Sequence, residues 1–309
     1  FDLHRRDFTI NTLAIRLDGA HFGELYDYWG GQTDLREHQI RVLHSLSFVD
    51  DPTRMLRAVR FEQRFGFQIE MRTLKLMLEA KGLLNNLSGD RIRHEINLIL
   101  DEMNCAGIFS RLDELQLLEA IHPSLPWNDL IYQDLHEKID LTPIEKWGKD
   151  TNIRFQTDRR TRGYLLWLSN LHGEDVIPVC RRLRLPESIV KNLLAIQKIV
   201  TRLPDLENSP PSKICQELDD FPLLALFMVF LKVNSGPAQV LENYILTWRT
   251  LNSKTTGDDL IKRGLPPGPV YQEILHRLRA AWLDGEVNSL EMEMALLDRI
   301  IESMKFDPK

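Results

Sequence analysis

The chain has 309 residues, of which 43% are hydrophobic and 27% charged, and its formal net charge is −6. This length allows two or more domains with a sizeable core, and the mild acidity excludes a uniformly basic nucleic-acid wrapper. Any surface for nucleic acid must therefore be a local basic patch.

The cysteines and the apolar runs indicate the kind of compartment in which the protein works. Cys105, Cys180 and Cys215 lie far apart and show no CxxC spacing. This pattern predicts buried thiols in a reducing compartment, without a disulfide framework or a metal site, and we expect a cytoplasmic protein. The longest apolar run, near 221–233, is too short to span a bilayer and predicts a buried helix.

The first 50 residues predict a small mixed α/β region. Residues 8–17 are rich in β-branched and apolar side chains, which predicts a buried strand followed by a turn. Residues 24–35 predict a glycine turn and a short helix capped at Thr33, and residues 40–43 predict a short strand. Because the chain opens at Phe1 without a methionine, we expect it to be the C-terminal part of a longer polypeptide.

An arginine-rich helix follows Pro52, after which the sequence predicts no further strand. Pro52 favours a first helical turn, Asp50 or Asp51 can cap it, and we expect the helix to end near Gly66. Arginines at 54, 57, 60 and 64 occupy about a third of its circumference. Such a stripe is either a solvated basic face or a site for an anionic, hydrogen-bonding ligand such as a nucleotide.

The remaining chain predicts helix after helix. Residues 124–160 are expected to be polar and irregular at first, and the charge cluster at 158–162 to begin a helix as solvated surface. Ser88 is the expected N-cap of the helix that follows it, and a Gly/Pro-rich loop at 257–269 precedes the last two helices. Helices are predicted near 72–80, 88–100, 108–118, 162–171, 174–183, 187–201, 211–218, 222–233, 238–249, 269–284 and 289–304.

Generic catalytic patterns are scarce: the sequence contains no HExxH, Walker A, GxGxxG or GxSxG motif. Three blocks remain, each with polar residues at the edge of an apolar element. They are Arg5-Arg6-Asp7-Phe8-Thr9-Ile10-Asn11, then Asp27 with Gly30 to Leu35 and Ile40-Arg41, then Asp50 to Phe65 supported by Ser88 to Arg91.

In this order and spacing, the three blocks resemble the class II tRNA nucleotidyltransferase and poly(A) polymerase family, which includes the CCA-adding enzymes. The resemblance is close over about residues 1–115 and looser beyond. It implies a mainly α fold, in which a truncated α/β remnant of the nucleotidyltransferase head precedes helical neck, body and tail domains. The expected divisions are 1–50 for the head remnant, 51–122 for the neck, 123–250 for the body and 251–309 for the tail.

The resemblance also implies nucleotide-binding positions. Asp51 and Arg54 match the pair that hydrogen-bonds the Watson–Crick edge of cytosine or adenine, so that side chains select the base. Arg6, Arg57 and Arg60 match further nucleotide contacts. Further candidates, with weaker support, are Arg5, Asp7, Asn11, Asp50 and Arg91.

Several of these assignments have plain structural alternatives. Arg5 can equally form a salt bridge at a strand end, and Asp50 stands where relatives usually carry a glutamate. For Arg91, an ion pair that braces the helix behind the Asp51–Arg54 pair is favoured over ligand contact, with Glu95 one turn on as its expected partner.

By the same resemblance, the body and tail are expected to bind the acceptor–TΨC region of tRNA through its phosphates. The candidate residues are Arg159, Arg160, Arg162, Arg181, Arg182 and Arg184. No metal ligand is assigned in this chain, because the carboxylates that hold Mg²⁺ in this family are expected upstream of Phe1.

The expected function is therefore base selection and RNA binding within an enzyme that uses ATP and CTP to extend tRNA 3′ ends. Without the catalytic carboxylates, we expect the chain alone to be inactive. The sequence leaves open whether C, A or both are added, and whether the enzyme is instead a poly(A) polymerase. A non-catalytic RNA-binding module is the alternative from another class.

Overall fold

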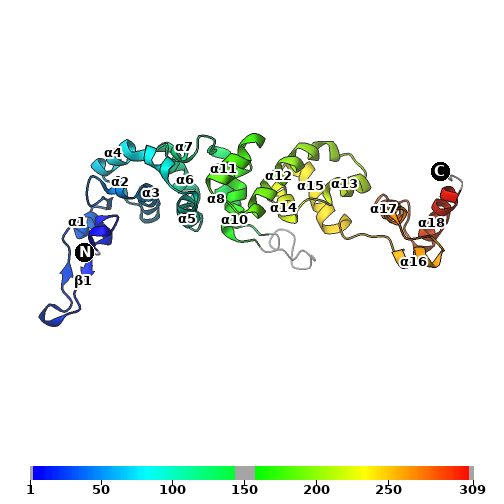
Figure 1. Cartoon of the computed structure of the whole chain (residues 1–309), viewed down its shortest axis with the longest axis horizontal. Coiled ribbons are helices and arrows are strands. Elements are labelled where there is room, and N and C mark those ends of the chain that lie inside the picture. Colours follow the sequence, from blue (N-terminus) through cyan, green and yellow to red (C-terminus); the bar gives the residue numbers. More distant parts are fainter. Residues whose placement is uncertain (1–2, 143–156, 306–309) are drawn as a thin grey trace. The chain divides into compact units, whose positions relative to one another are not determined.

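The computed structural model describes residues 3–142 and 157–305, with side chains up to 303, and it is predominantly helical, as predicted (Figure 1). The described residues form two compact units. Residues 3–141 and 157–194 make the first unit, and residues 195–305 make the second. The division into head, neck, body and tail at 50, 122 and 250 stays a prediction.

Short elements make up the start of the first unit, and the buried strand predicted over 8–17 is wrong. Thr9–Asn11 is a 3₁₀ turn, only Ala14–Ile15 is a strand, and Ile15 is 61% exposed. The chain turns because the Asp7 carboxylate accepts hydrogen bonds from the Phe8 N–H and from Asn11. The elements are η1 (Leu3–Arg5), η2 (Thr9–Asn11), β1 (Ala14–Ile15), η3 (Gly19–His21), β2 (Leu25–Tyr26), α1 (Gly31–Arg36), β3 (Gln39–Ile40) and α2 (Ser47–Asp50).

The arginine-rich helix is α3 (Thr53–Phe65), and both of its predicted ends are confirmed. Asp51 accepts from the Thr53 N–H at 3.0 Å, which satisfies a free donor of the first turn. Gly66 ends the helix at φ 66°, a left-handed conformation that suits glycine. Met55, Leu56, Ala58 and Val59 are fully buried on the opposite side of α3 from the arginines.

The rest of the first unit is helical except for β4 (Gln68–Ile69), which pairs in parallel with β3 and corrects the expectation of no strand after Pro52. The helix predicted over 108–118 is two helices, because Gln116 adopts a left-handed φ of 58°. Residues 124–142 include a helix, α8, that the sequence reading missed, and the expectation for 143–156 lies outside the described residues. The helices are α4 (Met71–Ala80), η4 (Lys81–Asn86), α5 (Gly89–Leu100), α6 (Cys105–Glu114), α7 (Leu117–Ile121), α8 (Asp129–Lys138), α10 (Arg159–Leu168), η5 (Gly173–Asp175), α11 (Val176–Arg182) and the start of α12 (Glu187–Leu206).

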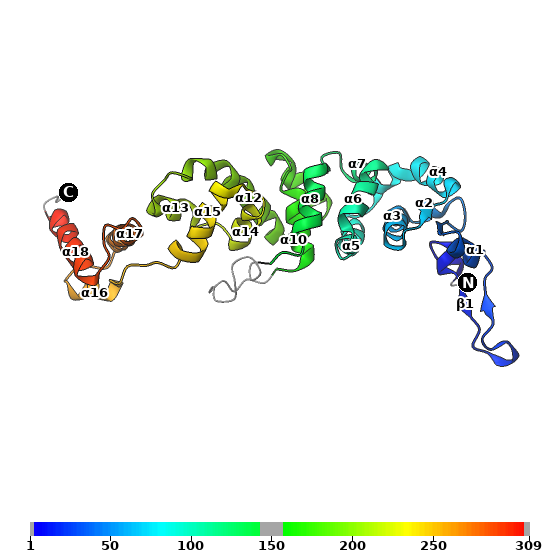
Figure 2. The ribbon, with the colours of Figure 1, turned by 180° about the vertical axis from the view of Figure 1, so that it is seen from behind.

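The second unit is built from α12 onward, and Figure 2 shows the ribbon from behind. The predicted buried helix is α14, whose residues 225–229 are all inaccessible to solvent. The helix predicted over 238–249 is divided, because a π-helical turn follows α15. The elements are α13 (Pro211–Leu218), α14 (Leu223–Phe230), α15 (Ser235–Asn243), η6 (Tyr244–Trp248), α16 (Gly257–Lys262), α17 (Pro269–Leu283) and α18 (Leu290–Lys305).

A buried carboxylate ties α17 and α18 to the segment before α16. Glu293 on α18 is 0% exposed and accepts hydrogen bonds from Lys254 N, Thr255 N, Thr255 Oγ1 and Trp282 Nε1. All of these donors are neutral groups of the chain, so the carboxylate is buried with its hydrogen bonds satisfied. Leu260, Ile274, Leu278 and Leu297 pack into one apolar cluster beside it.

Two general expectations can be compared with the fold. All three cysteines are buried and free, as predicted. In the parts of the chain that the structure describes, no helix combines the length and apolarity needed to cross a bilayer.

Candidate functional site

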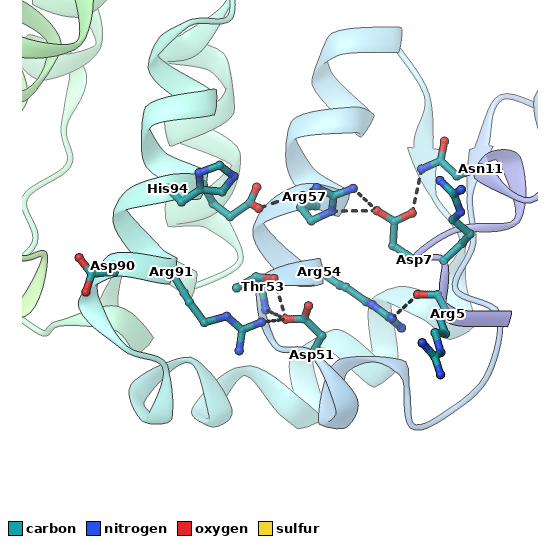
Figure 3. A pocket seen from close by; sticks show the side chains of 12 residues that line it. Arg5, Asp7, Asn11, Asp51, Thr53, Arg54, Arg57, Asp90, Arg91 and His94 are labelled. Atoms are coloured by element: carbon teal, nitrogen blue, oxygen red, sulfur yellow. Dashed lines mark hydrogen bonds and ion pairs between the residues drawn. The ribbon is translucent and has the colours of Figure 1, made fainter. Parts of the chain in front are cut away.

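A cavity of about 610 Å³ lies where the N-terminal segment, α3 and α5 meet (Figure 3). Three stretches of chain line it: the first of the polar blocks in the sequence, the start of α3 from the third block, and residues 90–95 of α5. No residue of the second block, from Asp27 to Arg41, is among its lining residues. The lining residues are Arg5, Arg6, Asp7, Asn11, Asp51, Thr53, Arg54, Arg57, Asp90, Arg91, His94 and Glu95.

Asp51 has one saturated carboxylate oxygen. Oδ1 accepts from Thr53 N at 3.0 Å, from Thr53 Oγ1 at 2.6 Å and from the Arg91 guanidinium at 2.6 Å. Oδ2 has no hydrogen-bond partner within residues 3–142 and 157–305. The cap of α3 thus holds Asp51 rigidly while it leaves one acceptor for a ligand.

Arg91 pairs with Asp51, which corrects the expectation that Glu95 is its partner (Figure 3). Glu95 is one turn further along α5 and is 5% exposed, with Arg57 Nη1 at 3.8 Å and Arg60 Nη2 at 3.9 Å. Instead of the predicted Arg91–Glu95 pair within α5, Glu95 forms two ion pairs with arginines of α3. Arg91 thus braces the start of α3, as an ion pair was predicted to do, but through Asp51 in the turn before that helix.

Arg57 joins α3 to the N-terminal segment. Its Nε and Nη2 both donate to Asp7 Oδ2, at 2.8 and 2.5 Å. Burial raises the pKa of Asp7, but the hydrogen bond from Asn11 and the positive charge of Arg57 lower it by more, so that it lies below its usual value. Asp7 is thus a carboxylate committed to Arg57 and Asn11 in this structure.

Arg60, predicted to contact nucleotide, does not line the cavity. It is 5% exposed and pairs with Glu102 at 3.3 Å as well as with Glu95. Burial raises the pKa of the Glu95 carboxyl, and Arg57 and Arg60 offset only part of this effect. After Arg57 the arginines of α3 therefore leave the cavity: Arg60 forms buried ion pairs, and Arg64 pairs with Glu102 from an exposed position.

Asp50 also lies outside the lining of the cavity. Its carboxylate is 3.6 Å from His44 Nε2 and its side chain is 55% exposed. The structure therefore brings eight of the ten predicted nucleotide-site residues to one cavity and leaves out Asp50 and Arg60.

The carboxylates of the cavity do not fit a metal site. Asp7 faces Arg57, Asp51 faces Arg91, Asp90 faces Arg93 and Arg184, and Glu95 lies between two arginines of α3. Among the described residues, no group of three or more His, Cys, Asp or Glu side chains could hold a metal ion. Each cavity carboxylate is matched to a guanidinium, so we derive no chemical step through a metal here.

Three of the six arginines predicted to bind RNA hold the fold together. Arg162 is 5% exposed and donates to Ile139 O at 2.7 Å. Arg159 donates to backbone carbonyls at the end of α5 and to Asp140. The Arg182 guanidinium donates to four carbonyls, those of Leu84, Asn85, Leu87 and Ile121.

The other three arginines are exposed. Arg160 pairs with Asp101 at 2.6 Å, and Arg184 with Asp90 at 2.5 Å. The side chain of Arg181 has no hydrogen bond or ion pair among the residues that the structure describes. Arg181 and Arg184 line a second, open cavity of about 600 Å³ with Arg93 and an apolar floor that includes Ile177 and Val190.

Sequence reasoning missed Thr53, Asp90 and His94 as cavity residues and assigned Glu95 another partner. Thr53 lies between Asp51 and Arg54 in the sequence, and this position could have identified it; in the structure its hydroxyl donates to Asp51. Asp90 and His94 lie one turn apart beside Arg91, on the face of α5 toward the cavity. Their helical spacing from Arg91 could have identified them.

Family models match two parts of the chain. Residues 1–41 match the model described as "Poly A polymerase head domain", and residues 66–128 match "Probable RNA and SrmB- binding site of polymerase A". An A-adding tRNA nucleotidyltransferase of Geobacter sulfurreducens is 36% identical over 98% of this chain, and one of Halalkalibacterium halodurans is 30% identical over 93%. The chain spans 35% and 65% of the length of these two relatives.

Solved structures with the same architecture are also similar in sequence. The Thermotoga maritima CCA-adding enzyme complexed with tRNA has a TM-score of 0.74 and 29% identity, over 98% of this chain and 73% of that one. A CCA-adding enzyme in complex with CTP has a TM-score of 0.76 and 30% identity, over 98% and 72%.

Proposed function

The chain belongs to the family of tRNA nucleotidyltransferases and poly(A) polymerases, and from this premise we propose that it selects the base and binds RNA in an enzyme that extends tRNA 3′ ends without a nucleic-acid template. The observation that carries the proposal is the turn before α3. There, an acceptor oxygen of Asp51 and the guanidinium of Arg54 line one cavity three residues apart.

The chemistry of this pair matches the bases that carry an exocyclic amine. Cytosine and adenine each present an amine donor next to a ring acceptor on the Watson–Crick edge, whereas uracil and guanine present a carbonyl in place of the amine. Asp51 Oδ2 accepts from the amine, and Arg54 donates to the ring acceptor. Arg6, Arg57 and Arg91 complete the nucleotide site, with Arg5, Asp7 and Asn11 at its edge.

We further propose adenosine addition as the main activity. The two relatives named above are A-adding tRNA nucleotidyltransferases, and the structural neighbours include complexes of a CCA-adding enzyme with ATP and with CTP. Addition of C as well, or extension of a poly(A) tail, are the alternatives that substrate assays distinguish.

RNA is proposed to cross the exposed arginines of the first unit. Arg160, Arg181 and Arg184 lie on the solvent side, and phosphates attract exposed guanidinium groups. Their contribution is electrostatic, so RNA affinity is expected to fall steeply with salt concentration. A flat dependence of log Kd on log salt would contradict these phosphate contacts.

Phosphoryl transfer in this family, by the resemblance, uses carboxylates that hold Mg²⁺. The carboxylates of the described cavity are paired with arginines, and we propose that the metal ligands belong to residues outside these 309. The 309 residues alone are then expected to add no nucleotide. Incorporation of labelled AMP or CMP into tRNA by this chain alone would refute that expectation.

The test of the proposed function is single-nucleotide addition by the full-length protein on tRNAs that end before C74, C75 and A76 (standard tRNA numbering). Asp51→Ala should abolish the preference for ATP or CTP over UTP and GTP. Glu79→Ala removes an exposed carboxylate on α4 that does not line the cavity; it is the matched control and should keep that preference. Unchanged selectivity in Asp51→Ala would exclude base reading by this turn.

A further inference from the structure

Arg54 differs in its partners from the other arginines of α3 and from Arg91. Those four each have a carboxylate within 4 Å, whereas Arg54, among the described residues, donates only to neutral oxygens. The positive charge of Arg54 is therefore not balanced by a fixed partner. The acceptors of the other four are Asp7 and Glu95 for Arg57, Glu95 and Glu102 for Arg60, Glu102 for Arg64, and Asp51 for Arg91.

Ser47 supplies the shortest of these neutral contacts. It is 0% exposed at the first position of α2, and its Oγ accepts from Arg54 Nη1 at 2.6 Å. The Ser47 carbonyl is 3.5 Å from the same nitrogen and accepts the Asp51 N–H at 3.2 Å. One residue thus contacts both members of the pair that is proposed to read the base.

A second anchor fixes the orientation of the guanidinium. Arg54 Nη2 donates to the backbone carbonyl of Arg5 at 2.9 Å, as Figure 3 shows. Because the guanidinium is planar, contacts at its two terminal nitrogens define its plane. The Nε–H and one terminal N–H have no acceptor within the described ranges, and they remain available to a ligand.

We propose that Ser47 is a positioning residue for base selection: its buried hydroxyl sets the plane of the Arg54 guanidinium without neutralising its charge. This inference rests on the proposed function of Arg54. A carboxylate at this position would hold the guanidinium equally well but would compete with the ligand for its donors. A hydroxyl orients the side chain and leaves its charge for the acceptors of the base.

The test measures kcat/KM of the full-length protein for ATP, CTP and UTP with Ser47→Ala and Ser47→Cys. Cysteine keeps the shape of serine and fills its space with a somewhat larger atom, but its thiol is a weak acceptor. Both variants should lose about tenfold in the preference for the cognate nucleotide over UTP, because a hydrogen bond to a charged group is lost in each. Loss of preference in Ser47→Ala with wild-type preference in Ser47→Cys would assign the effect to packing and overturn the proposal.

Thr73→Val is the matched control for a buried hydroxyl in the same unit. Thr73 is 1% exposed, its Oγ1 bonds to Glu70 at 2.9 Å, and it does not line the cavity. This variant should lower the melting temperature and leave base preference unchanged. An equal change of preference in Thr73→Val would mean that any destabilisation of the unit impairs selection, which contradicts a specific role for Ser47.

A double-mutant cycle with Arg54→Ala separates this inference from the proposed function. If Ser47 acts through Arg54, the double variant should be no less selective than Arg54→Ala alone. Independent, additive losses would overturn the positioning role. If Arg54→Ala itself keeps full base preference, the proposed function is refuted. If Arg54→Ala loses base preference while both Ser47 variants keep it, only the inference about Ser47 is refuted.

Discussion

Asp51→Asn is expected to weaken the preference of the enzyme for ATP and CTP while it leaves the fold nearly unchanged. The Oδ1 position of Asp51 faces three donors, from Thr53 and Arg91. In the variant, the amide oxygen must occupy that position, because the amide nitrogen would meet donors there. The nitrogen then takes the place of Oδ2 and presents N–H donors where the native side chain presents an acceptor.

The sizes of the two effects, on stability and on selectivity, follow from the contacts that asparagine keeps and from the one contact in which it replaces an acceptor with a donor. Asparagine caps a helix about as well as aspartate, so the bonds from Thr53 persist. The pair with Arg91 loses its charge, but both side chains are partly exposed, at 49% and 32%, and such pairs contribute about 0.2–1 kcal/mol. Donor-to-donor mismatch with a base costs about 1–3 kcal/mol, or roughly 5- to 150-fold in selectivity.

The assay compares single additions of ATP, CTP, UTP and GTP by the full-length protein, alongside a urea unfolding curve. Asp51→Asn should raise the use of UTP and GTP relative to ATP and CTP, because their carbonyls accept from the new amide, although their ring N–H groups still face the donors of Arg54. Stability should fall by no more than about 1 kcal/mol. Asp51→Ala should instead lose preference without gaining a new one. An Asp51→Asn enzyme that still prefers ATP or CTP as strongly as wild type would refute base reading through Oδ2.

Four further variants test other parts of the molecule. The folded-state pKa of Asp7 lies below its ordinary value of 3.8, so its carboxylate stabilises the fold above that pH, and this stabilisation is lost as the pH falls. Asp7→Asn should therefore flatten the decline in the free energy of unfolding below about pH 5. Arg182→Met should lower the free energy of unfolding in urea by about 3 kcal/mol, because four carbonyls lose their donor. Arg181→Ala should change this free energy by less than about 0.5 kcal/mol, but it should reduce the slope of log Kd for RNA against log salt by about one unit. Glu293→Ala should destabilise the second unit by about 3 kcal/mol, seen as an earlier unfolding transition by circular dichroism; a wild-type transition would show that its buried donors find other partners.

Local signals in the sequence predicted the helices better than the N-terminal segment. Pro52 and Gly66 mark the two ends of α3, and apolar spacing shows which face is buried, so neighbouring residues alone determine this element. The run at 8–17 has strand-like composition, but polar contacts decide its path. Thr9 Oγ1 donates to Asp34 at 2.5 Å and Thr9 N donates to Arg41 O at 3.0 Å, both distant in sequence.

Distant contacts also separate arginines that look alike in the sequence. Arg181 and Arg182 are adjacent, yet one is exposed without a described partner and the other donates to carbonyls 61 to 98 residues away. Helical periodicity places Arg60 on the same stripe as Arg57, but Glu102 draws it into a buried pair. Sequence spacing identifies the face of a helix, and only the fold identifies the carboxylate or carbonyl that meets each guanidinium there.

The balance of charge in the cavity bears on what it can recognise. Its lining includes five arginines and four carboxylates, so the cavity is nearly neutral despite its arginine-rich appearance in sequence. A triphosphate carries several negative charges and needs an excess of cations or a metal, whereas an uncharged base needs donors and acceptors in fixed positions. The pairing of Arg57 with Asp7, and of Arg91 with Asp51, suits the second task. Among the arginines of α3 and Arg91, Arg54, held by neutral oxygens, is then the one at which a change of charge should affect nucleotide binding most.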